Sequence, residues 1–390
     1  MISRRDFLKR AVLGGTAASF AARFPVASPL HAQNSGIPGK ELMIVRSPRF
    51  FDLEMPLDKL QSWITPVDLF FVRNHVSEPY SVNPDTWRLN VTGEVDHPLE
   101  LSYADLQKLD SVTVTNTLEC AGNGRAFFEP HAPGIQWQRG AVGNARWMGP
   151  RLNDLLNRAG VKPTGKHVVF KGLEEPPGKV PQFMRSIPIE KALDPDTLVA
   201  THMNGEKLSP HHGFPARIMV PGWIGAASLK WVAEIRVLDH EFDGNYMKPG
   251  YRLPERSLAP GEDLKPGDVT NAVTKLNVKS VIAAPGDGSL IRRRPFTIRG
   301  AAWAGEAEVT RVDVSVDNGQ TWKPADLGQD HAKYAWRLWQ YTWTPQKAGG
   351  YVIMSRATDS AGRVQPAQAA WNPSGYLWNA IDQVKIHVQA

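Results

Sequence analysis

The residues best suited to chemistry lie in one short segment, residues 117–125, which reads TLECAGNGR. It contains Cys120, the only cysteine among 390 residues. The run before it, residues 111–118, alternates β-branched and polar residues and predicts a strand. Residues 121–124 then predict a sharp turn, because their two glycines readily take positive φ. We therefore expect a single thiol at a strand end, on a tight turn, directly before the cation of Arg125.

Two interpretations of Cys120 follow from its residue type and neighbours. A lone cysteine is most often a small buried hydrophobe. The adjacent Arg125 favours another role, because a neighbouring cation lowers the pKa of a thiol and promotes the thiolate. A soft thiolate is a ligand that transition metals select. One thiolate cannot hold such a metal alone, so a cofactor would have to supply the other ligands.

Two further segments offer groups that suit anions. The apolar run at residues 68–75 ends in Arg73, Asn74 and His75, whose donors fit a phosphate or another oxyanion. The ordinary alternative is a strand whose end meets water. Residues 211–222 begin with two histidines, but no carboxylate or cysteine lies at ligand spacing, which argues against a zinc site.

The first residues have the pattern of a targeting segment. Arg4 and Arg5 form a twin-arginine pattern, and an apolar stretch of mainly small residues follows at residues 11–22. This stretch is too short to span a bilayer comfortably, which favours a signal peptide over a membrane anchor. We therefore expect residues 1–32 to be a signal peptide and the protein to reach the periplasm already folded.

The net charge argues against a nucleic-acid partner. Residues 1–32 hold five basic residues and one acidic residue, a charge of +4 out of the total of +6, which leaves +2 for the rest of the chain. The basic character therefore belongs mostly to the predicted signal, and we expect no separate nucleic-acid patch. A single cysteine also excludes a disulfide within the chain.

The elements predicted along the chain divide it into two parts. Helical and strand patterns mix up to a Pro-, Gly- and acid-rich linker at residues 258–268. Beyond it, short alternating strands follow one another, with Asp317-Asn318-Gly319 as a hairpin turn signal. This pattern predicts a β-sandwich of immunoglobulin type. The expected organisation is an α+β domain at residues 40–262 and a β-sandwich at residues 270–390.

Several of these segments together resemble the sulfite oxidase family of molybdopterin enzymes. The cysteine segment resembles the family's cysteine motif, and FFVRNH at residues 70–75 its FxxRNH motif. HGFPARIMVPG at residues 212–222 and GAASLKW at residues 225–231 resemble its phosphate-binding motifs. RVDVSVDNGQTW, from Arg311, resembles its dimerisation domain. The implied fold is a sulfite-oxidase-type molybdopterin-binding domain followed by an immunoglobulin-like dimerisation domain.

The resemblance implies a role for each matched residue. Cys120 would be the one protein ligand of molybdenum, and the pterin dithiolene would supply two more sulfurs. The residues implied to act in the reaction or line the substrate pocket are Cys120, Arg73, Arg125, Trp137 and Tyr251. The residues implied to bind the cofactor are Phe71, Arg73, Asn74, His75, Cys120, His212, Arg217, Ser228 and Lys230.

One position departs from the family pattern. The run that begins at Trp371 often carries a third anion-binding arginine in sulfite-oxidising relatives, and here that position is Ser374. A cage of three arginines is therefore in doubt. Arg185, which precedes a matched Ser-Ile-Pro, is a candidate to compensate.

The implied function is the oxidation of sulfite to sulfate at a Mo-molybdopterin centre. The chain has no Cys-x-x-Cys-His haem attachment and too few cysteines for an iron–sulfur cluster, so we expect no haem in this chain. The expected acceptor is a separate periplasmic c-type cytochrome. A homodimer, or a heterodimer with a cytochrome subunit, is expected by resemblance.

Three alternatives stay open at this point. The chain could be the molybdenum subunit of a sulfane dehydrogenase in thiosulfate oxidation, with the same fold and another sulfur substrate. It could be the catalytic subunit of a methionine sulfoxide reductase, although such relatives generally lack the C-terminal β-sandwich. It could also be a periplasmic binding protein without catalytic activity.

Overall fold

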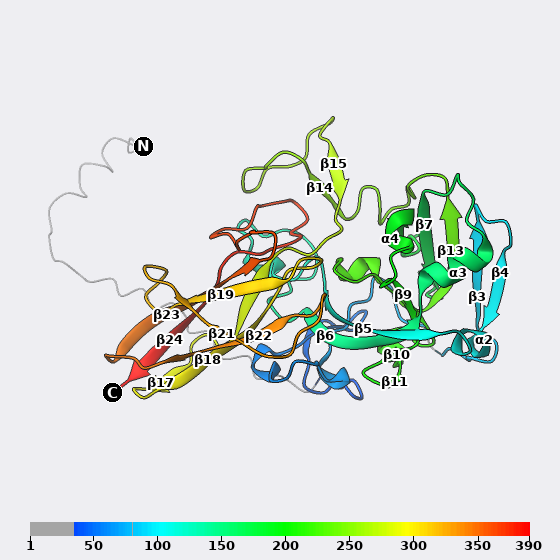
Figure 1. Cartoon of the computed structure of the whole chain (residues 1–390). Helices are drawn as coiled ribbons and strands as arrows, with labels where there is room; N and C mark the ends of the chain where they lie inside the picture. The colour runs from blue at the N-terminus through cyan, green and yellow to red at the C-terminus, as the bar shows by residue number, and fades with distance from the viewer. Residues whose placement is uncertain (1–34, 80) are drawn as a thin grey trace, which may run out of the picture. The chain divides into compact units, whose positions relative to one another are not determined.

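The computed structural model describes residues 35–79 and 81–390, so the predicted signal peptide at residues 1–32 lies outside the described part. Strands dominate this part, with a few short helices among them (Figure 1), as the predicted α+β class requires. Residues Ala32–Ala390 form one compact unit. The predicted division between residues 262 and 270 therefore stays a prediction of the sequence.

The first layer is a five-stranded mixed sheet in the order β4-β3-β13-β7-β8. β13 runs parallel to β3, whereas the other neighbours are antiparallel. Its strands are β3 (Arg88–Gly93), β4 (Leu99–Ser102), β7 (His167–Gly172), β8 (Met184–Pro188) and β13 (Val232–Leu238). Helix α3 (Leu152–Ala159) buries Leu152, Leu155, Leu156 and Ala159, which helical spacing places on one face. It ends at Gly160, whose φ is +68°.

Two more short helices and three small strand pairs complete this region. Helix α2 (Tyr103–Gln107) has Ser102 as its N-cap, and the Ser102 side chain forms a capping box with Asp105. Helix α4 (Ile189–Ala192) is a single turn. The paired strands are β1 (Ile44–Ser47) with β2 (Asp52–Glu54), β9 (Leu198–Ala200) with β12 (Arg217–Met219), and β14 (Arg252–Pro254) with β15 (Thr270–Ala272).

The second layer is a four-stranded sheet in the order β11-β10-β6-β5. Its strands are β5 (Ser111–Glu119), β6 (Val142–Pro150), β10 (His202–Met203) and β11 (Glu206–Lys207). β5 pairs with β6 along its whole length, from Ser111 opposite Pro150 to Glu119 opposite Val142. This long pairing fixes where β5 ends, and Cys120 is the next residue.

The C-terminal part is the predicted β-sandwich, which is confirmed. One sheet contains β16 (Lys279–Ala284), β18 (Phe296–Trp303), β22 (Arg337–Trp343) and β21 (Asp326–Leu327). The other contains β17 (Leu290–Arg292), β24 (Asp382–Gln389), β23 (Gly349–Asp359), β19 (Val309–Ser315) and β20 (Lys323–Pro324). β24 alternates buried and exposed residues along its length, so one face packs into the core between the sheets. The predicted turn has positive φ at Asn318 and Gly319.

Residues 68–75 differ from the predicted strand. They begin with a 3₁₀ turn, η2 (Val67–Leu69), and then make one isolated bridge, from Val72 to Leu53. The carbonyl oxygens of Val67 and Phe70 accept hydrogen bonds from the amine of Lys40 instead of from a neighbouring strand. The segment after β2 likewise forms only a 3₁₀ turn, η1 (Leu57–Lys59).

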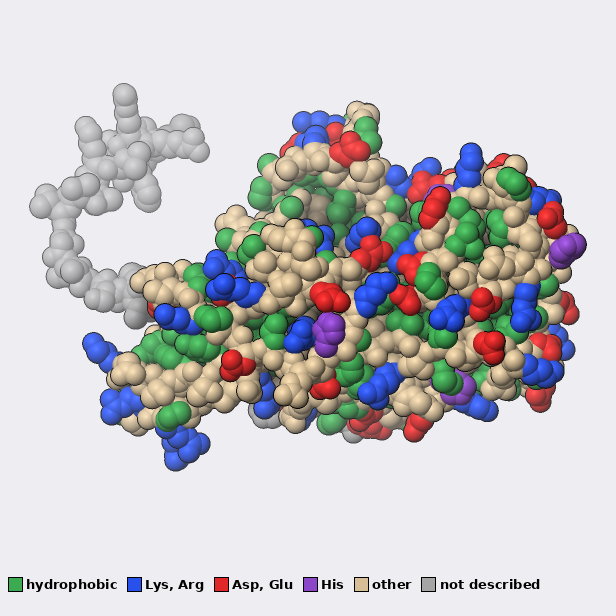
Figure 2. All heavy atoms as spheres, in the orientation of Figure 1, with side chains coloured by type: hydrophobic (Ala, Val, Ile, Leu, Met, Phe, Trp, Pro, Cys, Tyr) green, Lys and Arg blue, Asp and Glu red, His purple; other side chains and the backbone are tan. Residues whose placement is uncertain are grey.

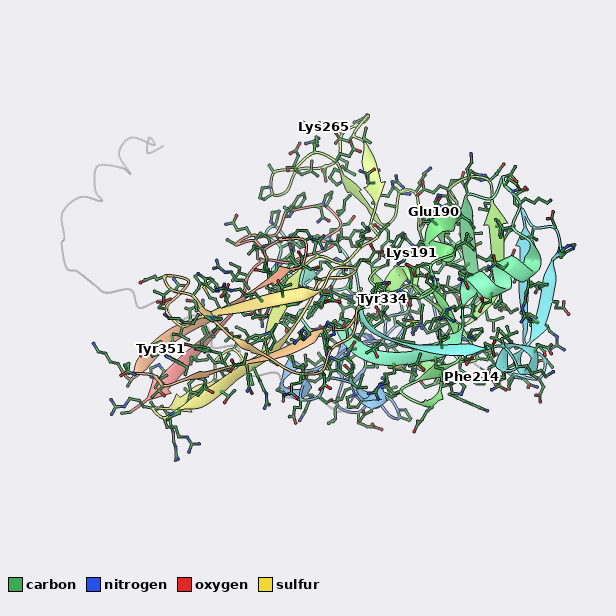
Figure 3. All side chains as sticks on the ribbon, in the orientation of Figure 1. Glu190, Lys191, Phe214, Lys265, Tyr334 and Tyr351 are labelled. Atoms are coloured by element: carbon green, nitrogen blue, oxygen red, sulfur yellow. The ribbon has the colours of Figure 1, made fainter. Side chains whose placement is uncertain are left out.

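Residues before β22 join the sandwich to the cysteine strand. Thr117 N donates to the Tyr334 carbonyl at 2.9 Å, and Trp336 N donates to Thr117 Oγ1 at 2.7 Å. Lys191 of α4 lies beside Tyr334 in Figure 3, with its amine 5.8 Å from the ring centroid. β5 is therefore held by β6 along its length and by the Tyr334 segment near its end.

The surface and helix lengths add two observations. Over the face shown in Figure 2, Lys and Arg side chains are interspersed with Asp and Glu. Among the described residues, none of the helices has the length and apolar composition needed to cross a bilayer.

Candidate active site

Cys120 sits at the start of a tight turn after β5. Its backbone N–H donates to the Ala141 carbonyl at 2.9 Å, and its carbonyl accepts from Asn123 N at 2.9 Å. A Cβ at Gly122 would lie 2.6 Å from the Arg125 guanidinium, so glycine is required for Arg125 to fold back over the turn. The predicted arrangement of strand end, thiol, turn and cation is therefore present.

The residue before Cys120 is a buried and fully engaged carboxylate. Glu119 accepts hydrogen bonds from Lys279 Nζ at 2.9 Å, Asn123 Nδ2 at 2.9 Å and Trp303 Nε1 at 2.8 Å. Lys279 and Trp303 belong to β16 and β18 of the sandwich. A buried charge is tolerated only when it is paired in this way. The sandwich therefore fixes the turn that presents Cys120.

Two pockets meet at Cys120. The inner pocket has an empty volume of about 690 Å³, and the outer pocket one of about 1220 Å³. Four residues line both pockets: Arg73, His75, Cys120 and Tyr251. A group held at Cys120 would therefore face both spaces.

The inner pocket is lined by basic side chains that bind carbonyl oxygens rather than carboxylates. Arg217 donates to the His212 carbonyl at 3.1 Å and to the Ser228 carbonyl at 2.8 Å, while its buried Nε has no partner. Lys230 donates to Asn74 Oδ1 and, at 3.0 Å, to the His211 carbonyl. These cations therefore lack a carboxylate counterion.

Burial lowers the pKa of the basic groups in the inner pocket. It lowers the pKa of Arg217 to about 9. Burial and the charge of Arg217 lower the pKa of Lys230 to about 7. Burial, then Lys40 and Lys230, hold the pKa of His212 well below its usual value. Such shifts mean that positive charge is costly here without an anion, so the inner pocket is prepared for an anionic ligand.

Lys40 supports this pocket from behind. Its amine lies 2.9 Å from His212 Nε2 and 2.7 Å from the Phe70 carbonyl oxygen, and it is almost fully buried. Burial lowers its pKa to about 7, against an opposing effect of Asp68. Lys40 therefore fixes both the His212 ring and the backbone of the η2 turn.

The outer pocket collects arginines around an aromatic wall. Arg73 Nη1 lies 3.2 Å from Asp52 Oδ1, which compensates its charge. Arg125 donates through Nε to the Ser374 carbonyl and through Nη1 to the Ile135 carbonyl, each at 2.9 Å, and has no carboxylate partner among the described residues. The outer pocket therefore presents guanidinium groups suited to a small oxyanion.

Tyr251 and His75 form a neutral pair between the two pockets. The Tyr251 hydroxyl lies 2.6 Å from His75 Nε2. Burial, followed by the charges of Arg73 and Arg185, lowers the pKa of His75 well below its usual value. Burial also raises the pKa of Tyr251 above its usual value. Phe183 stacks on the His75 ring with centroids 3.8 Å apart and fixes its orientation.

The expected lowering of the thiol pKa at Cys120 is not the net result. Arg73 and Arg125 do lower it, but burial has the larger effect, so the pKa of the Cys120 thiol is raised. The sequence showed the cation and could not show the depth of burial. In the absence of a metal, the thiol is the favoured form.

The structure brings together all but one of the predicted site residues. Those that line the inner pocket are Phe71, Arg73, Asn74, His75, Cys120, His212, Arg217, Ser228, Lys230 and Tyr251. Arg125 lines the outer pocket. Trp137 lines neither; it is fully buried, with its indole N–H unpaired. Ile135, whose carbonyl accepts from Trp137 N at 2.9 Å, lines the outer pocket, and the substrate contact of Trp137 stays a prediction of the sequence.

Three residues of the site were not predicted from the sequence. Glu174 lines the inner pocket, has one oxygen without a partner, and has a pKa raised to about 7 by burial. Lys40 lies behind His212. Tyr376 lines the outer pocket and stacks on Tyr251, with centroids 5.1 Å apart. Tyr376 lies two residues after Ser374 in the matched run, which was the one available signal.

Comparison with sequence families gives matches on both parts of the chain. Residues 75–246 match the family described as "Oxidoreductase molybdopterin binding domain". Residues 270–389 match the family described as "Mo-co oxidoreductase dimerisation domain". The second match covers the β-sandwich.

Similar proteins include sulfite oxidases of animals. The chain is 39% identical over 355 residues to sulfite oxidase of Gallus gallus, covering 86% of this chain and 76% of that protein. It is 37% identical over 360 residues to mitochondrial sulfite oxidase of Rattus norvegicus, covering 88% of this chain. The chain spans 65% of the length of the rat and human proteins, just under two thirds.

A solved structure agrees over nearly the whole chain. The sulfane dehydrogenase SoxCD from Paracoccus pantotrophus superposes with a TM-score of 0.75 at 28% sequence identity. The match covers 97% of this chain and 96% of the other.

Proposed function

Because the chain belongs to the sulfite oxidase family of molybdopterin oxidoreductases, we propose that it oxidises sulfite to sulfate and passes the electrons to an external c-type cytochrome. One observation carries the proposal. Cys120, Arg73, His75 and Tyr251 line both a cation-rich inner pocket and an outer pocket with guanidinium groups. That arrangement suits a metal cofactor on one side and a small oxyanion on the other.

The inner pocket fits the Mo-molybdopterin cofactor of this family. The buried cations of Arg217 and Lys230 lack carboxylate partners, and Arg217 Nε is unpaired, as expected of a site for a phosphate. Ser228 Oγ accepts from Val220 N at 3.0 Å, so its hydroxyl proton is free to donate to an anion. Cys120 is the thiolate available to the metal. When bound, the cofactor supplies the oxygen-atom transfer and takes up two electrons.

The outer pocket positions the substrate. Arg125 attracts the anion, and Arg73, partly compensated by Asp52, holds the side nearest Cys120. When neutral His75 carries its proton on Nε2, it donates to the Tyr251 oxygen, and the Tyr251 hydroxyl then donates its own proton to the anion without adding a negative charge. Sulfite and one water become sulfate, two protons and two electrons. Two one-electron acceptor molecules of the cytochrome class each take one electron.

The test is sulfite-dependent reduction of cytochrome c by the purified, cofactor-containing protein. The proposal predicts turnover that requires sulfite and saturates with it. Turnover with thiosulfate or a protein-bound sulfane and none with sulfite would contradict it. We also propose that the protein works in the periplasm, and fractionation of cells that express the full chain tests this.

A sulfane dehydrogenase is the second candidate, favoured by two observations. Ser374 and Tyr376 line the outer pocket where an arginine was expected, which gives the pocket an aromatic wall. The sulfane dehydrogenase structure also matches nearly the full chain. A methionine sulfoxide reductase is less consistent with the dimerisation-domain match at residues 270–389. That match supports a dimer, whose partner is either a second copy or a cytochrome subunit.

A further inference from the structure

Arg185 is a buried cation without a carboxylate partner. It lies on β8 and is 1% exposed. Its Nη1 donates to the Tyr246 carbonyl and its Nη2, at 3.5 Å, to the Val273 carbonyl, while Nε has no partner. Within residues 35–79 and 81–390, no Asp or Glu forms an ion pair with it. No ion pair therefore compensates its positive charge, and Glu241 acts on it only at longer range.

This charge lies against the wall of the outer pocket. Arg185 Cζ is 4.7 Å from the centroid of the Tyr251 ring. The Tyr251 and Tyr376 rings are nearly parallel, with an interplanar angle of 8°. Arg125 Cζ is 5.5 Å from the centroid of Tyr376. Two stacked tyrosines therefore each have a guanidinium over the ring, and only Arg125 reaches the pocket directly.

The direct charges in the pocket do not match a doubly charged anion. Arg73 is paired with Asp52, so the two largely cancel. Arg125 contributes one uncompensated charge, and Ser374 contributes none. Arg49 also lines the pocket, but it is exposed and packs over Phe50, so solvent screens its charge. A dianion that binds beside Tyr251 would find its second deep positive charge behind the ring.

We propose that Arg185 is a positioning residue that supplies this second charge through Tyr251, so that the outer pocket selects dianionic over monoanionic oxyanions. The proposal rests on the proposed function, whose substrate it restricts to the dianion. A purely structural role, in which Arg185 only holds the Tyr246 and Val273 carbonyls, is the competing account. In the proposal the positive charge of Arg185 acts on the bound anion, whereas in the structural account only its hydrogen bonds to the two carbonyls matter.

The first measurement needs no variant. In the cofactor-containing parent protein, inorganic sulfate should bind about tenfold more tightly than nitrate, because one more charge interacts with the partly buried cation. Titration calorimetry measures both anions without turnover. Equal affinities would overturn the proposal. Loss of sulfite oxidation with intact sulfate selectivity would contradict the proposed function and leave this inference standing.

The variants then identify the source of the charge. Arg185→Met should raise KM for sulfite and weaken sulfate binding about tenfold, with kcat changed less than about threefold. Arg185→Lys should stay within about threefold of the parent, because the charge is kept. Arg185→Gln keeps amide donors without the charge and should behave like Arg185→Met. It replaces Arg185→Met in the test if that variant does not fold. Lys and Met variants with equal defects would overturn the proposal.

A rescue and a control complete the test. Ser374→Arg places a direct cation in the same pocket, so adding it to Arg185→Met should recover most of the lost sulfate affinity. Arg252, the neighbouring arginine, is bound to Glu241 at 3.4 Å and does not line the pocket. Arg252→Met should therefore leave sulfate selectivity unchanged. A selectivity loss in Arg252→Met as large as that in Arg185→Met would overturn the specific role of Arg185.

Discussion

The hydroxyl of Tyr251 lies 2.6 Å from Nε2 of His75, although 176 positions separate the two residues in the sequence. The pKa of His75 is lowered and that of Tyr251 is raised, in both cases chiefly by burial. Both groups are therefore neutral near pH 7. The pair stands where the inner and outer pockets meet, beside Cys120.

Removing the hydroxyl tests the role of this pair. Tyr251→Phe should lower kcat/KM for sulfite about ten- to a hundredfold, because a hydrogen bond to the reacting anion is lost. Steady-state kinetics at saturating acceptor measures this. Tyr351→Phe is the matched control, since that hydroxyl binds the Lys347 carbonyl within the sandwich (Figure 3). Equal kinetics for Tyr251→Phe and the parent would remove Tyr251 from the mechanism.

The ion pair behind Cys120 gives a prediction on stability. Lys279→Met leaves Glu119 as a buried carboxylate without its cation, which should reduce the free energy of unfolding by about 3–5 kcal/mol. The double variant Glu119→Gln/Lys279→Met should recover a large part of this loss, because no charge remains unpaired. Urea denaturation followed by fluorescence measures both. If the double variant loses as much unfolding free energy as Lys279→Met, or more, the two residues are not coupled.

The buried cations predict how stability without cofactor depends on pH. The pKa of Lys230 is lowered to about 7 by burial, against an ordinary value of 10.5. Between pH 7 and 9 the unfolded state binds this proton and the folded state does not, so stability should rise with pH. Below pH 7 both states are protonated and this contribution becomes constant. The urea midpoint at pH 7, 8 and 9 measures the slope.

Lys230→Met provides the control for that slope. The variant cannot titrate at this position, so its midpoint should rise less between pH 7 and 9 than that of the parent. Lys40, whose pKa is also lowered to about 7 by burial, should maintain part of the rise. A midpoint that falls over this window in the cofactor-free parent would contradict the assigned burial of these cations.

Local signals explain which elements could be predicted from the sequence. β5 was predictable because its alternation is regular and its end is marked by a glycine turn. Helix α3 was predictable because its apolar residues repeat at helical spacing and Gly160 ends it. The turn at Asn318 and Gly319 needs positive φ, which these residue types supply. Each of these features depends on neighbours in the sequence.

The features that could not be predicted depend on distant residues. Apolar residues before Arg73 suggested a strand, but Lys40 binds the carbonyls of this segment and keeps it as a turn. Trp137 has the sequence neighbours of a pocket residue, and only the structure shows that its side chain is fully buried. The stacking of Tyr376 on Tyr251 joins the two ends of the site across 125 positions, which no local pattern encodes.

The most direct test of the central claim replaces Cys120 with serine. Cys120→Ser keeps the size of the side chain and the backbone contacts of the turn, but it removes the only thiol among the described residues. The account predicts a folded protein with parent-like circular dichroism, a changed absorption spectrum and no sulfite-dependent reduction of cytochrome c. Molybdenum and pterin, quantified in the same sample, show whether the cofactor is still bound. A Cys120→Ser protein with parent-like spectrum and turnover would contradict the claim that Cys120 is the metal ligand at the centre of this site.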